Sequence, residues 1–98
     1  MNFETGGAIK IRDFDLSPNP SQGEINVQFS MDPLQLGESL NVRIISLDGK
    51  VIEEMVLDNF DGNFSKSFDL TDKPSGIYLF QAEKNMQKFT KRFVLKRN

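Results

Sequence analysis

The 98-residue chain is long enough for one domain, and its 38% apolar and 27% charged residues are typical of a folded globular domain. It contains no cysteine and no histidine, which excludes disulfides, Ser-His-Asp or Cys-His catalysis, and zinc or copper sites built on these side chains. The net charge of −2 hides an asymmetry, since residues 1–83 carry fourteen acidic and six basic side chains, whereas residues 84–98 carry six basic and no acidic ones. Because the chain lacks cysteine and histidine, we predict a domain that is not an enzyme and needs no cofactor or metal.

Residues 1–8 include Gly6-Gly7-Ala8 and almost no apolar pattern. They are typical of a linker from an upstream domain of the same natural chain, which leaves residues 9–98 as the folded domain. The chain has neither the basic and apolar regions of a secretory signal nor the roughly 20 apolar residues that a membrane helix requires. If the domain is exported, we expect Met1 to begin an expressed fragment rather than the natural protein.

Alternation of apolar and polar residues predicts strands along the rest of the chain. The pattern is most regular at Ile25, Val27 and Phe29, while residues 77–82 are nearly continuously apolar, as in a central strand covered on both faces. Seven strands are predicted, around residues 9–14, 25–29, 40–44, 51–57, 64–70, 77–82 and 89–95. No helix of useful length is predicted. Short strands spaced about ten residues apart predict an all-β sandwich.

Turn residues separate these strands. The Asp48-Gly49 pair favours a type I′ hairpin, because both central residues of that turn need a positive φ. Residues 17–23 contain two prolines, which remove two backbone donors and exclude a strand interior. Residues 72–76 form a tight corner just before Tyr78, whose hydroxyl we expect to bind nearby backbone, as in the tyrosine corner of immunoglobulin-like sandwiches.

Two further patterns have simpler explanations than a ligand site. Asp58, Asp61 and Asn63 offer oxygen ligands for calcium, but their spacing does not match a helix–loop–helix site and these residue types are common in turns. Residues 88–93 place basic side chains beside Phe89 and Phe93, as in nucleic-acid proteins. Both phenylalanines, however, share the parity of a buried strand face, and the chain is acidic overall, so no nucleic-acid partner is predicted.

Four segments, taken in order, resemble the motifs of the type A C-terminal sorting domains of bacterial type IX secretion. Residues 16–23 are similar to the opening PNPxxG motif, residues 45–51 to the strand–DGK–strand hairpin, residues 70–79 to the "L…GxYxL" element, and residues 91–98 to the lysine-rich final strand. The resemblance covers residues 14–98.

This resemblance implies a seven-stranded immunoglobulin-like antiparallel β-sandwich that directs an upstream cargo domain through the type IX translocon. The folded domain would be recognised in the periplasm and removed by a cell-surface sortase, leaving the cargo at the outer membrane, on the cell surface or secreted. The motif residues carried over as turn and corner formers are Pro18, Asn19, Pro20, Gly23, Asp48, Gly49, Gly76 and Tyr78. Those carried over to translocon recognition are Lys91, Arg92, Lys96 and Arg97. Cleavage would fall within Thr5, Gly6, Gly7, Ala8, Ile9 and Lys10.

The recognition hypothesis places the last strand at or near a sheet edge, where a receptor reads its unpaired backbone and basic side chains. Deleting residues 94–98 should then leave the cargo folded but held in the periplasm. The same edge predicts a homodimer through edge strands. The alternative function is an immunoglobulin- or fibronectin-like module that binds carbohydrate or spaces the domains of a secreted enzyme. Phe60 is its candidate contact, although the chain has no tryptophan and one tyrosine.

Overall fold

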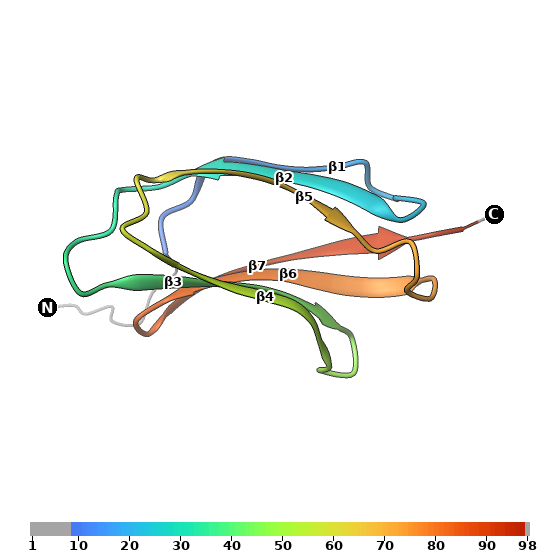
Figure 1. The fold of residues 1–98 in the computed structure, drawn as a ribbon. Coiled ribbons are helices and arrows are strands. Elements are labelled where there is room, and N and C mark those ends of the chain that lie inside the picture. The colour runs from blue at the N-terminus through green and yellow to red at the C-terminus, as the bar shows by residue number, and fades with distance from the viewer. Residues whose placement is uncertain (1–8, 98) are drawn as a thin grey trace, which may run out of the picture.

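The computed structural model describes residues 9–97 as two antiparallel β-sheets packed face to face (Figure 1). The three-stranded sheet has the order β1–β2–β5, from β1 (Arg12–Ser17), β2 (Glu24–Ser30) and β5 (Asn63–Asp69). The four-stranded sheet has the order β4–β3–β6–β7, from β3 (Ser39–Ser46), β4 (Val51–Asp58), β6 (Gly76–Lys84) and β7 (Gln87–Leu95). The predicted all-β sandwich of seven strands is confirmed. Within residues 9–97 there is no helix that could cross a membrane.

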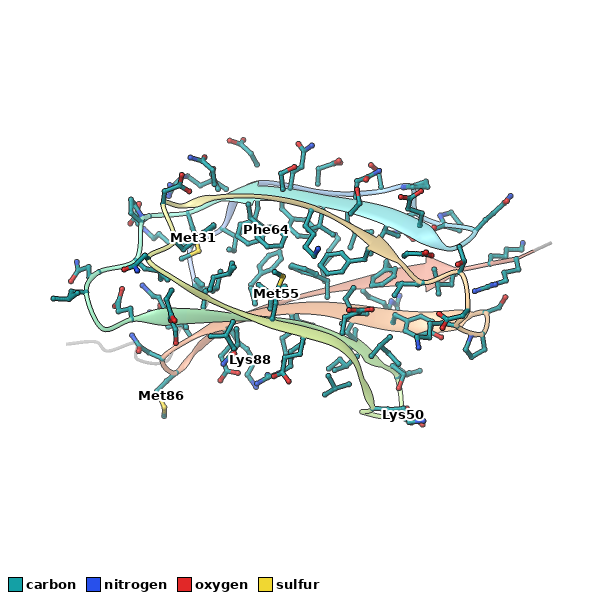
Figure 2. All side chains as sticks on the ribbon, in the orientation of Figure 1. Met31, Lys50, Met55, Phe64, Met86 and Lys88 are labelled. Atoms are coloured by element: carbon teal, nitrogen blue, oxygen red, sulfur yellow. The ribbon has the colours of Figure 1, made fainter. Side chains whose placement is uncertain are left out.

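The core lies between the sheets and is dominated by phenylalanine. Phe80 on β6 is fully buried, and its ring centroid lies 5.7 Å from that of Phe14, 6.2 Å from that of Phe29 and 6.4 Å from that of Phe64. Figure 2 shows Phe64 and Met55 in the space between the two sheets. Tilted and offset aromatic pairs of this kind stabilise a core beyond the area that they bury, which explains the high phenylalanine content of a chain without tryptophan.

Two lysines interrupt the core-facing rows of edge strands. Lys66 on β5 shares the face of Phe64 and Phe68, and its ammonium lies 5.5 Å from the ring centroid of Phe68. Lys91 on β7 is paired with Phe80 in the register and is exposed. Inward-pointing charges on edge strands oppose pairing with another chain, so both lysines protect the open edges of the sandwich.

The prediction of a type I′ turn between β3 and β4 was wrong. Gly49 has a φ of 93°, whereas Asp48 is not among the residues with positive φ. The Gly49 N–H donates to the Ser46 carbonyl at 2.9 Å, and the Ser46 N–H donates to the Lys50 carbonyl at 2.9 Å. The loop therefore holds three residues rather than two, and only its last residue needs the left-handed conformation.

Two other expectations are corrected in detail. The strand predicted at residues 9–14 begins at Arg12 and is broken by a bulge, with Asp13 at a φ of 53°. Residues 77–82 lie in a central strand as predicted, but its outer face is not covered, because Ile77 and Leu79 stay partly exposed. An apolar run therefore does not prove cover on both faces.

Candidate recognition surface at one pole of the sandwich

All four predicted motif segments lie at one end of the sandwich, on the right in Figure 1. The connections β1–β2, β3–β4 and β5–β6 and the end of β7 meet there because the odd-numbered strands all run toward this end (Figure 1). We call residues 18–23, 47–50, 70–76 and 94–97 together the motif pole. The chain enters at the opposite end, where Ile9 lies beside Met31 and Gln87.

The proline-containing loop is bonded to the end of the last strand. The Val94 N–H donates to the Asn19 Oδ1 at 3.0 Å, and the Ser21 N–H donates to the Val94 carbonyl at 2.9 Å. The Lys96 N–H donates to the Ser21 carbonyl at 2.7 Å. Ser17-Pro18 and Asn19-Pro20 are both cis peptide bonds. The first and last motifs of the sequence thus form one surface.

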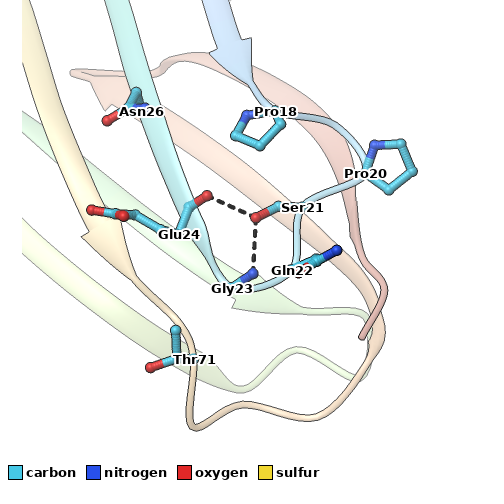
Figure 3. Close-up of a pocket in the computed structure, with 8 residues that line it drawn as sticks. All are labelled: Pro18, Pro20, Ser21, Gln22, Gly23, Glu24, Asn26 and Thr71. Atoms are coloured by element: carbon cyan, nitrogen blue, oxygen red, sulfur yellow. Dashed lines mark hydrogen bonds between the residues drawn. The ribbon is translucent and has the colours of Figure 1, made fainter. Parts of the chain in front are cut away.

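Ser21 is a residue of this site that the sequence analysis missed. Its side chain is buried, and its Oγ accepts the Gly23 N–H at 2.9 Å and donates to the Glu24 carbonyl at 2.7 Å (Figure 3). Both bonds fix the turn into β2. A serine two residues before a glycine in a turn segment is the signal that could have identified it.

Gly23 connects the loop to the β5–β6 corner. The Leu70 N–H donates to the Gly23 carbonyl at 2.7 Å. A Cβ on Gly23 would lie 2.6 Å from the Thr71 Cγ2 and 3.0 Å from the Thr71 Cα. The φ of Gly23, 151°, already disfavours other residues. The motif requires glycine here because two backbone segments approach too closely for any side chain.

We expect Gly23→Ala to lower the free energy of unfolding by about 3 kcal/mol, combining overpacking against Thr71 with backbone strain. Gly37→Ala is the matched control, because Gly37 has a φ of 87° but no atom within 4 Å of the added Cβ. It should cost about 1 kcal/mol, the strain alone. Urea denaturation of both purified variants measures the difference. If both variants lost the same free energy of unfolding, the close approach of Gly23 to Thr71 would not be the reason for glycine in this motif.

The prediction of a tyrosine corner between β5 and β6 is confirmed. The buried Tyr78 donates its hydroxyl to the Pro74 carbonyl at 2.7 Å, and its ring stacks on Phe93 with centroids 5.9 Å apart. At the start of the corner, the Thr71 hydroxyl and backbone N–H both donate to Asp69 and lower the pKa of its carboxyl group. Gly76 leads from the corner into β6 with a φ of 156°.

The β3–β4 hairpin adjoins this corner. The hydroxyl of Ser46 and the backbone N–H of Lys50 lower the pKa of Asp48, which lies on the surface. A small cleft separates the hairpin from the corner and is lined by Ser46, Asp48, Lys50, Ile52, Lys73, Pro74 and Tyr78. Hairpin and corner therefore share one surface at the motif pole.

The four basic residues predicted for recognition are placed differently from one another. Lys91, Arg92 and Lys96 are exposed. The Arg97 guanidinium donates to the Leu70 carbonyl at 2.8 Å and to the Lys73 carbonyl, and its backbone N–H donates to the Ser75 Oγ at 3.1 Å. Arg97 thus fastens the tail to the β5–β6 corner, whereas the other three present their charges to solvent.

The open edge of β7 is shorter than predicted. Val94 directs its N–H and carbonyl toward the proline loop, away from β6. Because strands alternate with a period of two, Arg92, Thr90 and Lys88 direct theirs to the same edge. Among residues 9–97 no backbone partner bonds this stretch, since β7 ends its sheet. The backbone of residues 88–92 is therefore unpaired on its outer edge, while that of residues 94–96 is already engaged.

Comparison with known protein families shows which family this chain matches. The family model of the secretion system C-terminal sorting domain matches residues 15–96, a span that contains the first three motif segments and residues 91–96 of the fourth. The chain belongs to this family. The sorting domain is the C-terminal signal of the type IX secretion system, which exports cargo across the outer membrane to the cell surface or the medium. It interacts with that machinery and with an upstream cargo domain, and its family is one of secretion signals, not of catalysts. No curated protein matches the chain.

The predicted cleavage region lies partly outside the described residues of the sorting domain. Thr5, Gly6, Gly7 and Ala8 belong to the part that the structure does not describe. Ile9 is 4% exposed and packs in the core, whereas Lys10 is exposed. The buried Ile9 side chain is therefore out of reach of a protease while the domain is folded.

The remaining candidate patterns serve the fold. The Asp61 carboxylate accepts the Asn63 N–H at 2.9 Å, which closes the β4–β5 turn, and residues 9–97 contain no group of three acidic side chains placed to hold a metal. Phe89 contacts Phe14 with centroids 4.9 Å apart. Phe60 is partly buried and meets Phe64 edge to face at 6.4 Å, so the candidate carbohydrate contact packs against the core.

Proposed function

We propose that the type IX machinery recognises the sorting domain in the periplasm as a folded body, and that it reads the motif pole. The observation that carries this proposal is the set of hydrogen bonds from Asn19 and Ser21 to Val94 and Lys96. These residues are about 75 positions apart in the chain and form one surface only after folding. A linear signal would not need the two segments to be joined.

The charge of the last strand supports an acidic receptor. Lys91, Arg92 and Lys96 are exposed on or beside β7, and residues 84–98 contain no acidic side chain. Complementary charge speeds encounter and rejects wrong partners, which suits a tag carried by many cargoes. The open backbone of residues 88–92 adds a site where a receptor strand can pair, provided that the receptor supplies an acidic side chain for the inward-facing Lys91, which opposes pairing with other chains.

The position of Ile9 supports a domain boundary at residues 8 and 9 and a cleavage site before Ile9, within Thr5–Ala8 rather than at Lys10. The described chain begins at Ile9, at the pole opposite the motif pole (Figure 1), and a cargo that precedes it in the chain would leave the recognition surface free. A surface sortase then reaches the linker without unfolding the domain. A homodimer through edge strands would use the same open stretch of β7, and the inward-facing Lys91 opposes it.

The charge hypothesis is tested with a fluorescent reporter carrying residues 1–98 in a type IX-competent bacterium. We expect the combined variant Lys91→Gln, Arg92→Gln and Lys96→Gln to reach the surface about tenfold less, because rim charges chiefly affect encounter. The matched control removes the same charge elsewhere, with Lys10→Gln, Arg12→Gln and Lys84→Gln. Arg12 forms only an exposed ion pair with Asp32 at 3.4 Å, which contributes little to stability. Equal delivery of both variants would remove the basic side chains from the mechanism.

A further inference from the structure

The outer face of the four-stranded sheet is divided into an apolar half and a charged half. In the half nearest the motif pole, Val51, Ile45, Leu79 and Arg92 stand in one row across all four strands. Ile77 and Val94 pair in the next row, beside the hairpin that carries Leu47. The residues of β3, β6 and β7 in these rows point away from the core, because their strand neighbours Ile44, Tyr78 and Phe93 are buried, and Val51 pairs with Ile45 on the same face.

The other half of the same face is mostly polar and internally paired, with Val56 as its exposed apolar residue. The Arg43 Nε lies 2.9 Å from the Glu54 carboxylate, and its Nη1 lies 3.2 Å from the Glu83 carboxylate. These bonds raise the pKa of Arg43, with Glu54 as the largest cause. A solvated sheet face of an antiparallel sandwich is ordinarily polar throughout. The apolar half therefore departs from what the fold requires.

We propose that this apolar half, formed by Leu47, Val51, Ile45, Leu79, Ile77 and Val94, docks on an apolar, acid-rimmed surface of a protein of the type IX machinery. The inference rests on the proposed function and adds a second contact beside the β7 edge. Val51 is 48% exposed and Leu47 is 64% exposed. A cluster of this kind on one side of a monomer is typical of an interaction site.

The rim of the patch identifies the chemistry of the occupant. Arg92 ends the central row, Lys96 follows Val94 on the same side of the strand, and Lys50 precedes Val51. Asp48 is the acidic residue of the adjoining hairpin, so the rim is mainly basic. An occupant with acidic residues around an apolar centre complements it, whereas a second copy would bring the same basic rim against itself. The described chain begins at the opposite pole (Figure 1), so an upstream cargo is not the expected occupant of this patch.

The test compares two double variants of the reporter fusion. Leu79→Thr with Val51→Thr removes the centre of the patch, and threonine keeps a β-branched side chain suited to a strand. Val56→Thr with Leu36→Thr is the control, since Val56 lies on the same face in the charged half and is 57% exposed, and Leu36 is 99% exposed in the β2–β3 loop. We expect surface delivery to fall at least about tenfold for the patch variant, as for a central interface residue, and to stay unchanged for the control.

The outcomes separate this inference from the proposed function. If the unmodified fusion stays in the periplasm, the proposed function fails, and this inference with it. If the unmodified fusion and the patch variant are delivered equally, the docking inference alone is overturned. Thermal unfolding of the purified variants shows whether they fold.

A second measurement covers a patch variant that does not fold. A photo-crosslinking residue at position 51 should give an adduct in exporting cells that disappears in a strain without the translocon, while the same residue at position 56 gives none. An adduct of two copies of the fusion, or equal adducts from both positions, would overturn the inference.

Discussion

Phe80→Ala is expected to remove a large share of the stability of the sorting domain and to lower surface delivery of its cargo in proportion to the fraction that unfolds. Phe80 is fully buried among Phe14, Phe29 and Phe64. Replacing a buried phenylalanine by alanine typically costs about 3–5 kcal/mol, a large share of the roughly 5–15 kcal/mol that stabilise a domain. Urea denaturation measures the loss of stability, and a protease-sensitive reporter on intact cells measures delivery.

The control for this experiment is Phe80→Leu, which keeps most of the volume and should cost about 1.5 kcal/mol and preserve delivery. Since Phe80 has no exposed surface, it cannot contact a receptor, and any loss of delivery acts through the fold. Surface delivery of an unfolded Phe80→Ala domain at the normal level would mean that the machinery reads a linear segment.

Deleting residues 94–98 is expected to unfold the domain rather than remove a signal from an intact one. Leu95 is 1% exposed in the core, and losing a buried leucine costs about 2–5 kcal/mol. The deletion also removes the bonds of Val94 and Lys96 to the proline loop and those of Arg97 to the β5–β6 corner, each worth about 1 kcal/mol. The total loss approaches the stability of an ordinary small domain.

Circular dichroism and urea denaturation of the purified truncation measure this effect, with Lys96→Gln as a control that removes an exposed charge and keeps the chain length. A truncated domain with the unfolding midpoint of the intact one would contradict the structural role of the tail. The expectation of a folded but undelivered cargo stays a prediction, but a failure of export by this truncation does not separate unfolding of the sorting domain from loss of a recognised strand.

The strands and the positions of their turns follow from the sequence, because a two-residue period and the residues that break it are local signals. Tyr78 was predicted correctly for the same reason, since its partner Pro74 is four residues away. The hydrogen bond from the Val94 N–H to the Asn19 Oδ1 could not be predicted in this way. It joins positions 75 residues apart, and the residue pattern of neither segment indicates the other as its partner.

The basic tail shows a second limit of sequence reasoning. Lys91, Arg92, Lys96 and Arg97 look alike as a charge cluster, but Arg97 binds backbone carbonyls of another loop and Lys91 points along the core side of an edge strand. Which charge is free depends on loop geometry that charge patterning does not contain. The apolar half of the outer face was likewise hidden, because Ile77 and Leu79 read as parts of a strand covered on both sides.

The measurement that tests the central claim most directly is the location of a periplasmic fluorescent reporter fused to residues 1–98. It is scored by protease accessibility on intact cells, in strains with and without the type IX translocon. A folded sorting domain that is recognised at its motif pole predicts reporter at the surface or in the medium in the first strain and inside the outer membrane in the second. Reporter that stays protected in both strains, while the purified fusion is folded, would contradict the account.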